Sequence, residues 1–152
     1  MIALYQRFTS LDRSNRRLVL ETASLMALVW AGLRLFRFPT LRRALDCYVR
    51  SRTTGHKVHP QPNPATIARV RWAITVVADR FPPATCLVQA LTADAILRRR
   101  GISCELRIGV RGGGNGSAPI EAHAWIDCDD AVAIGAIEDL SEFRVLAAPR
   151  PA

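Results

Sequence analysis

The chain has 152 residues, of which 49% are hydrophobic and 22% charged, and this balance excludes a wholly disordered protein. A chain of this length forms one domain, with or without a helical appendage, and buries a sizeable core without disulfide cross-links. The formal net charge is +8, and all of the 21 basic residues except Lys57 are arginines. Such a charge favours acidic partners, although a genome rich in G and C explains the arginine content equally well.

Residues 1–50 are predicted to form a helical hairpin. The stretch 18–35 has a wide apolar face, and Pro39 separates it from a second, shorter helix. Glu21 and Arg34 interrupt the apolar stretch, so it suits a buried or interfacial helix better than a membrane span. We expect the hairpin to pack on the rest of the chain or to dock a partner, and peripheral membrane contact is one such expectation.

Residues 51–64 are predicted to be a proline-rich linker, because three prolines within five positions exclude a helix. Residues 65–152 are predicted to form the domain that carries the chemistry. Apolar residues at spacings of three and four predict an amphipathic helix over 65–81. A second helix is expected over 86–100, closed by Gly101.

The residues after this second helix alternate as strands do. Apolar side chains occupy every second position, with polar or charged side chains between them. Helices followed by strands with short turns predict an α+β fold with an antiparallel sheet. The expected strands are 102–110, 120–128, 131–134 and 144–147, and a short helical piece is expected at 137–143.

Cys86 is the strongest candidate for a nucleophile. It opens the second helix of this domain, with Thr85 as the predicted cap. Unpaired backbone N–H groups and the positive end of the helix dipole favour the thiolate there. The same N–H groups could hold the oxyanion that forms when the sulfur attacks a carbonyl. From its position alone, Cys86 is equally well explained as a small buried residue on a stripe with Ala90 and Leu97.

His123 is the candidate base. It lies within a predicted strand, on the face opposite the apolar one, and a strand holds its side chain rigidly. Taken alone, it is better explained as a sheet histidine without a role. A cysteine at a helix start together with a histidine on a later strand is, however, the arrangement expected of cysteine hydrolases and acyl transferases.

A third group should orient the imidazole of His123, and several groups compete for this role. Asp127 lies on the same strand face but four positions along, roughly 13 Å away, which is too far for a direct bond. Asp139 is preferred, because it lies just past the point where the chain returns opposite His123. The other candidates are Asp129, Asp130, Glu138, the backbone and a water molecule.

The other cysteines are interpreted as structural. None of the four forms a C-x-x-C pair, and the three histidines add no metal-finger spacing, so neither a metal nor another cofactor is expected. Cys104 and Cys128 lie on apolar strand faces, where a free cysteine packs as a small hydrophobe, and Cys47 carries no chemical pattern. No signal peptide is visible, so we expect a cytoplasmic protein with reduced cysteines.

Four runs of sequence carry a family resemblance. They are CLVQAL (86–91), LRRRGI (97–102), LRIGV (106–110) and AHAWID (122–127). In this order and spacing they resemble the transglutaminase-like protease of lasso-peptide biosynthesis, the C-terminal, leader-cleaving half of the B protein. The resemblance covers about residues 65–148, and the hydrophobic N-terminal helices also resemble those that precede this protease in the family.

The resemblance implies a papain-like, transglutaminase-like fold and a cysteine endopeptidase that removes the leader from a ribosomally made precursor peptide. The resemblance assigns the role of nucleophile to Cys86 and the role of base to His123. The family's leader-binding module has no counterpart here, so the resemblance implies the stand-alone form. Its partners would be the precursor peptide, a separate leader-recognition protein and an ATP-dependent lasso cyclase. One position departs from the family, because Gly135 stands where relatives often have an acid.

Two other functions remain open from the residues alone. One is a binding module, either an inactive transglutaminase-like domain or a basic nucleic-acid binder. The arginines are scattered, aromatic residues are 7% of the chain and no nucleic-acid motif is present, so a nucleic-acid partner is not expected. The other is acyl transfer to an amine, for which the same cysteine and histidine would serve.

Overall fold

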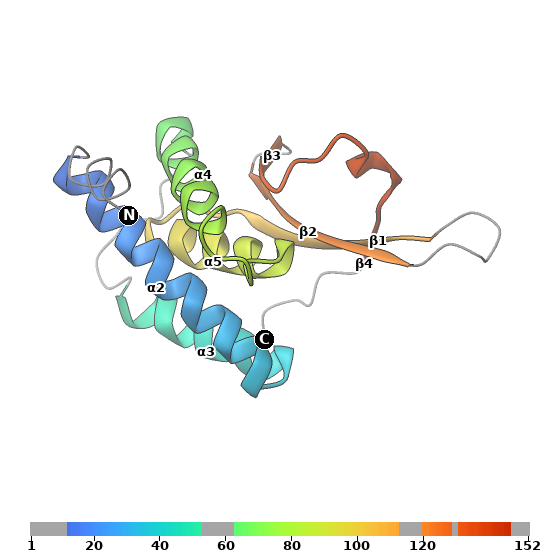
Figure 1. Cartoon of the computed structure of the whole chain (residues 1–152), viewed down its shortest axis with the longest axis horizontal. Coiled ribbons are helices and arrows are strands. Elements are labelled where there is room, and N and C mark those ends of the chain that lie inside the picture. Colours follow the sequence, from blue (N-terminus) through green and yellow to red (C-terminus); the bar gives the residue numbers. More distant parts are fainter. Residues whose placement is uncertain (1–11, 53–62, 113–119, 129–130, 147–152) are drawn as a thin grey trace.

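The computed structural model describes residues 12–52, 63–112, 120–128 and 131–146. In this part of the chain, four helices precede a four-stranded sheet of order β3-β2-β1-β4, in which every neighbouring pair is antiparallel (Figure 1). The predicted α+β fold with an N-terminal helical part is confirmed. The elements are α2 (Arg13–Leu35), α3 (Phe38–Arg52), α4 (Pro64–Ala78), α5 (Cys86–Arg99), β1 (Glu105–Arg111), β2 (Glu121–Cys128), β3 (Ala131–Ile134), the short 3-10 helix η1 (Leu140–Glu142) and β4 (Arg144–Leu146).

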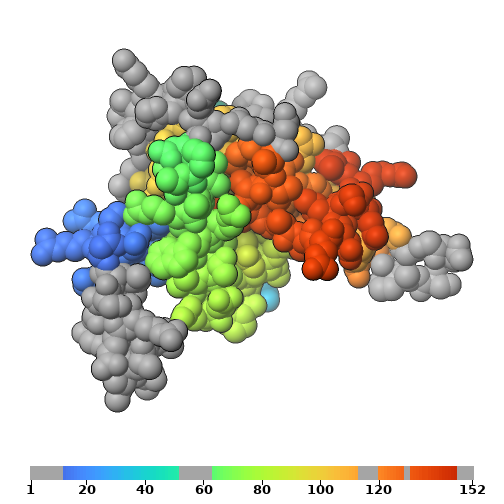
Figure 2. Space-filling view, turned by 90° about the horizontal axis from the view of Figure 1, so that it is seen from above, coloured from blue at the N-terminus to red at the C-terminus, as the bar shows by residue number. Residues whose placement is uncertain are grey.

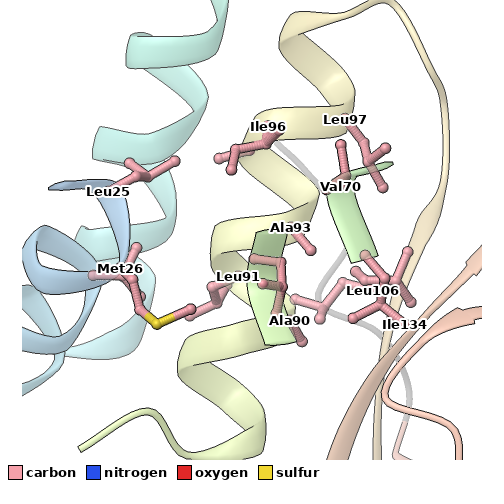
Figure 3. Packing of buried hydrophobic residues seen from close by; sticks show 14 of the residues in the cluster. Leu25, Met26, Val70, Ala90, Leu91, Ala93, Ile96, Leu97, Leu106 and Ile134 are labelled. Atoms are coloured by element: carbon pink, nitrogen blue, oxygen red, sulfur yellow. The ribbon is translucent and has the colours of Figure 1, made fainter. Parts of the chain in front are cut away.

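Helix α5 lies at the centre of the hydrophobic core. Its side chains are buried along most of its length, and several are alanines, which let neighbouring elements approach closely. In Figure 3, Met26 of α2 faces Leu91 of α5 from one side, while Leu106 and Ile134 of the sheet pack on the other. The N-terminal helices therefore share one core with the residues that follow 65. Residues 53–62 of the predicted linker lie outside the described residues.

Helix α2 buries one face and exposes another. Asp12 caps it by accepting a hydrogen bond from the Asn15 N–H at 3.2 Å. Its buried face includes Leu25 and Met26, whereas Leu20 and Leu28 are 56% and 66% exposed. By length and composition α2 is long and apolar enough to cross a membrane, and 33% of its most apolar window is buried. A core helix of a soluble protein passes the same test, so this finding is weak evidence of a membrane span.

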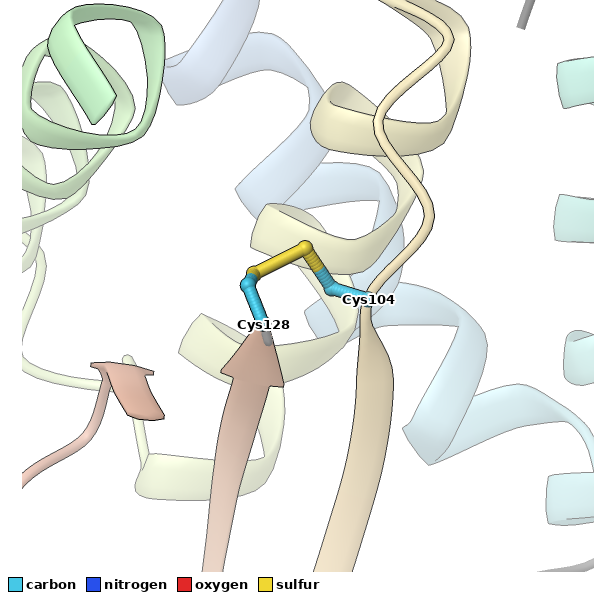
Figure 4. The surroundings of a disulfide bond; sticks show 2 residues. All are labelled: Cys104 and Cys128. Carbon is cyan, nitrogen blue, oxygen red and sulfur yellow. A yellow bond between two sulfur atoms is a disulfide. The ribbon is translucent and has the colours of Figure 1, made fainter. Parts of the chain in front are cut away.

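Cys104 and Cys128 form a disulfide bond, which joins the ends of β1 and β2 (Figure 4). The prediction that both remain free thiols is wrong. Antiparallel pairing sets Glu105 opposite Asp127, so the next pair outward is Cys104 and Cys128, with Cα atoms 4.5 Å apart. A bond across a sequence separation of 24 stabilises the fold by about 3 kcal/mol, largely through the unfolded state.

A charged network holds the C-terminal half of α5 against α3. Asp94 is the one buried charged side chain among the described residues, at 1% exposure. Its carboxylate accepts hydrogen bonds from Arg42 at 2.7 Å and Arg98 at 3.3 Å, and Arg98 also donates to Asp46 at 2.6 Å. Burial raises the pKa of Asp94 above its ordinary value, although both arginines act in the opposite direction. Removing this carboxylate would leave Asp46 as the one acid that the two partly buried arginines share among the described residues.

Candidate active site

Cys86 begins α5, as the sequence indicates. Thr85 caps the helix, with its hydroxyl oxygen 3.5 Å from the Val88 backbone nitrogen. The thiol is half-buried, and its Sγ lies 4.0 Å from the carbonyl oxygen of Ala122, within the distance of a weak S–H hydrogen bond. Ala122 directly precedes His123 on β2, so the sulfur lies beside the strand that carries the candidate base.

The start of α5 also offers donors for an oxyanion. The first N–H groups of a helix have no partner within it. Among the described residues, the N–H groups of Cys86 and Leu87 have no hydrogen-bond acceptor. They lie at the end of the helix that carries the sulfur. An oxygen that becomes negative when the sulfur attacks a carbonyl can accept hydrogen bonds from them.

His123 is oriented by a backbone carbonyl. Its Nε2 lies 2.8 Å from the oxygen of Gly135. A carbonyl oxygen can only accept, so Nε2 carries the proton, and in the neutral ring Nδ1 is left as the basic nitrogen. The ring stacks on Trp125 with centroids 6.1 Å apart and tilts against Phe143 at 5.8 Å. The tautomer that a general base requires is thus set without a carboxylate.

Cys86 and His123 line one pocket. Its volume is about 220 Å³, and most of its walls are small or apolar. No hydrogen bond joins Sγ to the imidazole among the described residues, and such contacts often tighten only when a substrate binds. The spatial requirement of the cysteine–histidine hypothesis, a shared cleft, is therefore met. The lining residues are Cys86, Gln89, Ala90, His123, Ala124, Ile134, Gly135, Ala136 and Ile137.

Gly135 explains why a carbonyl orients the ring and a side chain does not. Its φ is +84°, a left-handed conformation that L side chains rarely adopt. A Cβ at this position would lie 3.0 Å from the Ala124 oxygen and 3.1 Å from the Trp125 Cβ. An acid therefore does not fit at residue 135 with this backbone. The main-chain oxygen of the same residue meets His123 instead.

Asp139 lies elsewhere. Its carboxylate is 3.4 Å from Arg111, which also donates hydrogen bonds to Glu121 and, at 2.8 Å, to Glu142. These bonds, that to Glu121 above all, raise the pKa of Arg111 above its ordinary value. The guanidinium also lies 5.0 Å above the Phe143 ring, so the cluster holds the segment that carries η1 near the ring of His123. The preferred orienting role of Asp139 has no support in this geometry.

The other candidates for the group that orients His123 do not contact its ring, where the structure describes them. Asp127 forms an ion pair with Arg107 at 2.7 Å, and Glu138 is exposed. Asp129 and Asp130 lie outside the described residues. Of the candidate groups that the structure describes, the backbone is the one that it brings to His123.

Gln89 is a pocket residue to which the sequence pattern assigned no role. Its side-chain amide donates to the Ala84 carbonyl at 2.8 Å, which spans the turn before Cys86. One N–H of the amide is used in this bond, and the second has no acceptor among the described residues. Its spacing of three residues from Cys86, which places both on one helix face, is the signal that could have revealed it.

A model of the transglutaminase-like superfamily matches residues 25–148, more than half of the chain. The match begins within α2, so it includes helices that the sequence assigned to a separate N-terminal region. No curated protein and no solved structure matches the chain. Among the described residues, no group of three or more histidines, cysteines or acids could hold a metal ion.

Proposed function

The chain belongs to the transglutaminase-like superfamily, and from that premise we propose that it is a cysteine peptidase that removes the leader from a ribosomally made precursor peptide. The observation that carries the peptidase proposal is the pocket shared by Cys86 and His123, with Gly135 leaving Nδ1 of the ring as the base. The sequence resemblance to the lasso-peptide leader protease supports the choice of substrate.

The proposed reaction has two steps. In the first, His123 takes the thiol proton, Sγ of Cys86 attacks the scissile carbonyl, and the N–H groups at the start of α5 stabilise the oxyanion. The carbon–nitrogen bond breaks, and His123 returns the proton to the departing amine. In the second step water loses a proton to His123 and attacks the thioester, which releases the carboxylic acid and regenerates the thiol.

The proposed partners follow from the resemblance. A separate leader-recognition protein would deliver the precursor, and an ATP-dependent cyclase would close the ring of the released core peptide. The wall of the pocket near Cys86 is mainly apolar and its volume is about 220 Å³, which suits one small apolar side chain beside the scissile bond.

Peptide cleavage tests the proposal. The full chain is incubated with a mixture of synthetic peptides, and the products are identified by mass spectrometry. We expect cleavage that falls by about 1000-fold or more in Cys86→Ala and in His123→Ala. Cys47→Ala is the matched control, because Cys47 is an exposed free cysteine on α3, and it should cleave like the wild type.

Two outcomes would contradict the proposal. Cleavage that survives in Cys86→Ala would place the chemistry elsewhere. Products that gain the mass of an added amine, in place of water, would show acyl transfer to an amine, as in a transglutaminase. Both outcomes are read from the same spectra.

A further inference from the structure

A second cavity, of about 570 Å³, lies far from the cysteine along α5. It is formed where the first turns of α2 and α4 meet the end of α5. Figure 2 shows the start of α2, in blue, beside α4, in green, and the two helices pack against each other. Arginines dominate its charged lining: Arg13, Arg17, Arg69 and Arg100 face a single acid, Glu21.

The positive charge of this arginine cleft is not neutralised within the described residues. Both oxygens of Glu21 are already bound, to Arg99 at 2.8 Å and to Arg100 at 2.9 Å. Within the described part of the chain, Arg69 donates to neutral side chains alone, those of Ser14 and Asn15, at 2.7 and 2.9 Å. The cleft is therefore left with a surplus of cations.

Arg13 and Arg17 strengthen this conclusion. Both are exposed, and neither has an ion-pair partner among the described residues. They are four residues apart on α2, where two like charges weaken a helix. The segments that adjoin the cleft in sequence, 1–11 and 53–62, contain Arg7 and Lys57 but no aspartate or glutamate. Neither of these two segments therefore supplies a carboxylate to the cleft, and Glu21 is the one acid in its described lining.

We infer that the arginine cleft binds the carboxylates of an acidic segment of the peptide substrate. This inference rests on the proposed peptidase function. Guanidinium groups bind carboxylates through paired hydrogen bonds, and several spread along one cleft suit several carboxylates of one chain. The mainly apolar pocket at Cys86, of about 220 Å³, cannot select such a segment, so the two sites would recognise different parts of one substrate.

The length of α5 sets the spacing between the two sites. Cys86 begins the helix and Arg100 directly follows its last residue. A helix of 14 residues is about 21 Å long at 1.5 Å per residue. An extended peptide covers this distance with about seven residues, and a path over the surface needs more. The acidic segment would therefore lie at least about seven residues from the scissile bond.

Binding is measured first, without catalysis. Fluorescein-labelled hexaglutamate is titrated with the full chain carrying Cys86→Ala, and anisotropy is recorded. We expect saturable binding that weakens at least about tenfold in Arg13→Gln/Arg17→Gln, while hexaglutamine does not bind. The control is Arg43→Gln/Arg50→Gln, which removes the same charge from exposed positions on α3 and should bind like the parent protein.

Competition and cleavage separate the possible outcomes. Equal binding by the two double variants would overturn the inference, and so would displacement of hexaglutamate by low concentrations of inorganic phosphate, which would indicate a phosphate ligand.

In cleavage assays with wild-type Cys86, Arg13→Gln/Arg17→Gln should raise KM for a peptide with a distant glutamate segment and leave kcat unchanged. Cleavage by a protein that does not bind hexaglutamate would refute the acidic-segment site and leave the peptidase proposal standing. Specific binding without any cleavage would refute the peptidase proposal and leave an acidic-peptide binding site.

Discussion

The two ends of α5 differ in how their polar groups are used. At the C-terminal end, Arg98 binds Asp46 and Asp94, and Arg99 binds Glu21 and the Tyr48 hydroxyl. At the N-terminal end, the thiol of Cys86 is 4.0 Å from its nearest partner, and the first N–H groups have no acceptor among the described residues. One helix is thus anchored at one end and left chemically available at the other.

This contrast indicates how the fold would support the proposed reactive site without a large loss of stability. Unpaired donors near a substrate pocket contribute nothing to folding, and they are useful only if the helix that carries them is held rigidly. The ionic contacts of α5 with α2 and α3, together with its buried apolar side chains, supply that rigidity. The N-terminal helices therefore support the site although they carry none of its reactive groups.

The largest effect on stability is expected from Asp94→Ala, which breaks the anchored end. The variant removes the buried carboxylate that Arg42 and Arg98 bind and leaves them the less buried Asp46. We expect a loss of about 3 kcal/mol in the free energy of unfolding, measured by urea denaturation. The exposed Asp79 provides the control, since Asp79→Ala should change stability by less than about 0.5 kcal/mol. Equal effects of the two variants would contradict the anchoring role.

A smaller effect on stability, with a marked effect on activity, is expected from Gly135→Ala. The new Cβ would meet the Ala124 oxygen at 3.0 Å in a left-handed conformation, so we expect a loss of about 2 kcal/mol and a fall in peptidase activity of about tenfold. Gly112→Ala is the control, because a Cβ there meets nothing within 4 Å. Full activity in Gly135→Ala would mean that the carbonyl does not position His123.

The sequence sufficed for the elements and for the positions of Cys86 and His123 within them, because helix capping and strand alternation are local patterns. These patterns predicted Cys86 at a helix start and His123 on a strand. The group that orients His123 could not be identified in this way, because every residue has a backbone carbonyl and only the fold selects that of Gly135. The Cys104–Cys128 bond was missed for a related reason, since it depends on the register between two strands.

The smallest effect is expected from Asp139→Asn, at the edge of the reactive region. Asp139 is exposed and is one of three acids that surround Arg111, so the remaining two still hold that guanidinium. We expect peptidase activity within about threefold of the wild type and a stability change below about 1 kcal/mol. A loss of activity as large as that of His123→Ala would restore Asp139 as the orienting acid.

Cysteine alkylation tests most directly whether Cys86 and His123 act as a pair. Cys47 and Cys86 are the two free cysteines, and Cys47 is the more exposed. The native chain is treated with limiting iodoacetamide at neutral pH, and peptide mapping gives the labelling rate at each cysteine. We expect Cys86 to react faster than Cys47, and to lose this advantage in His123→Ala. Faster labelling of Cys47, with no change in Cys86 when His123 is replaced, would contradict the account.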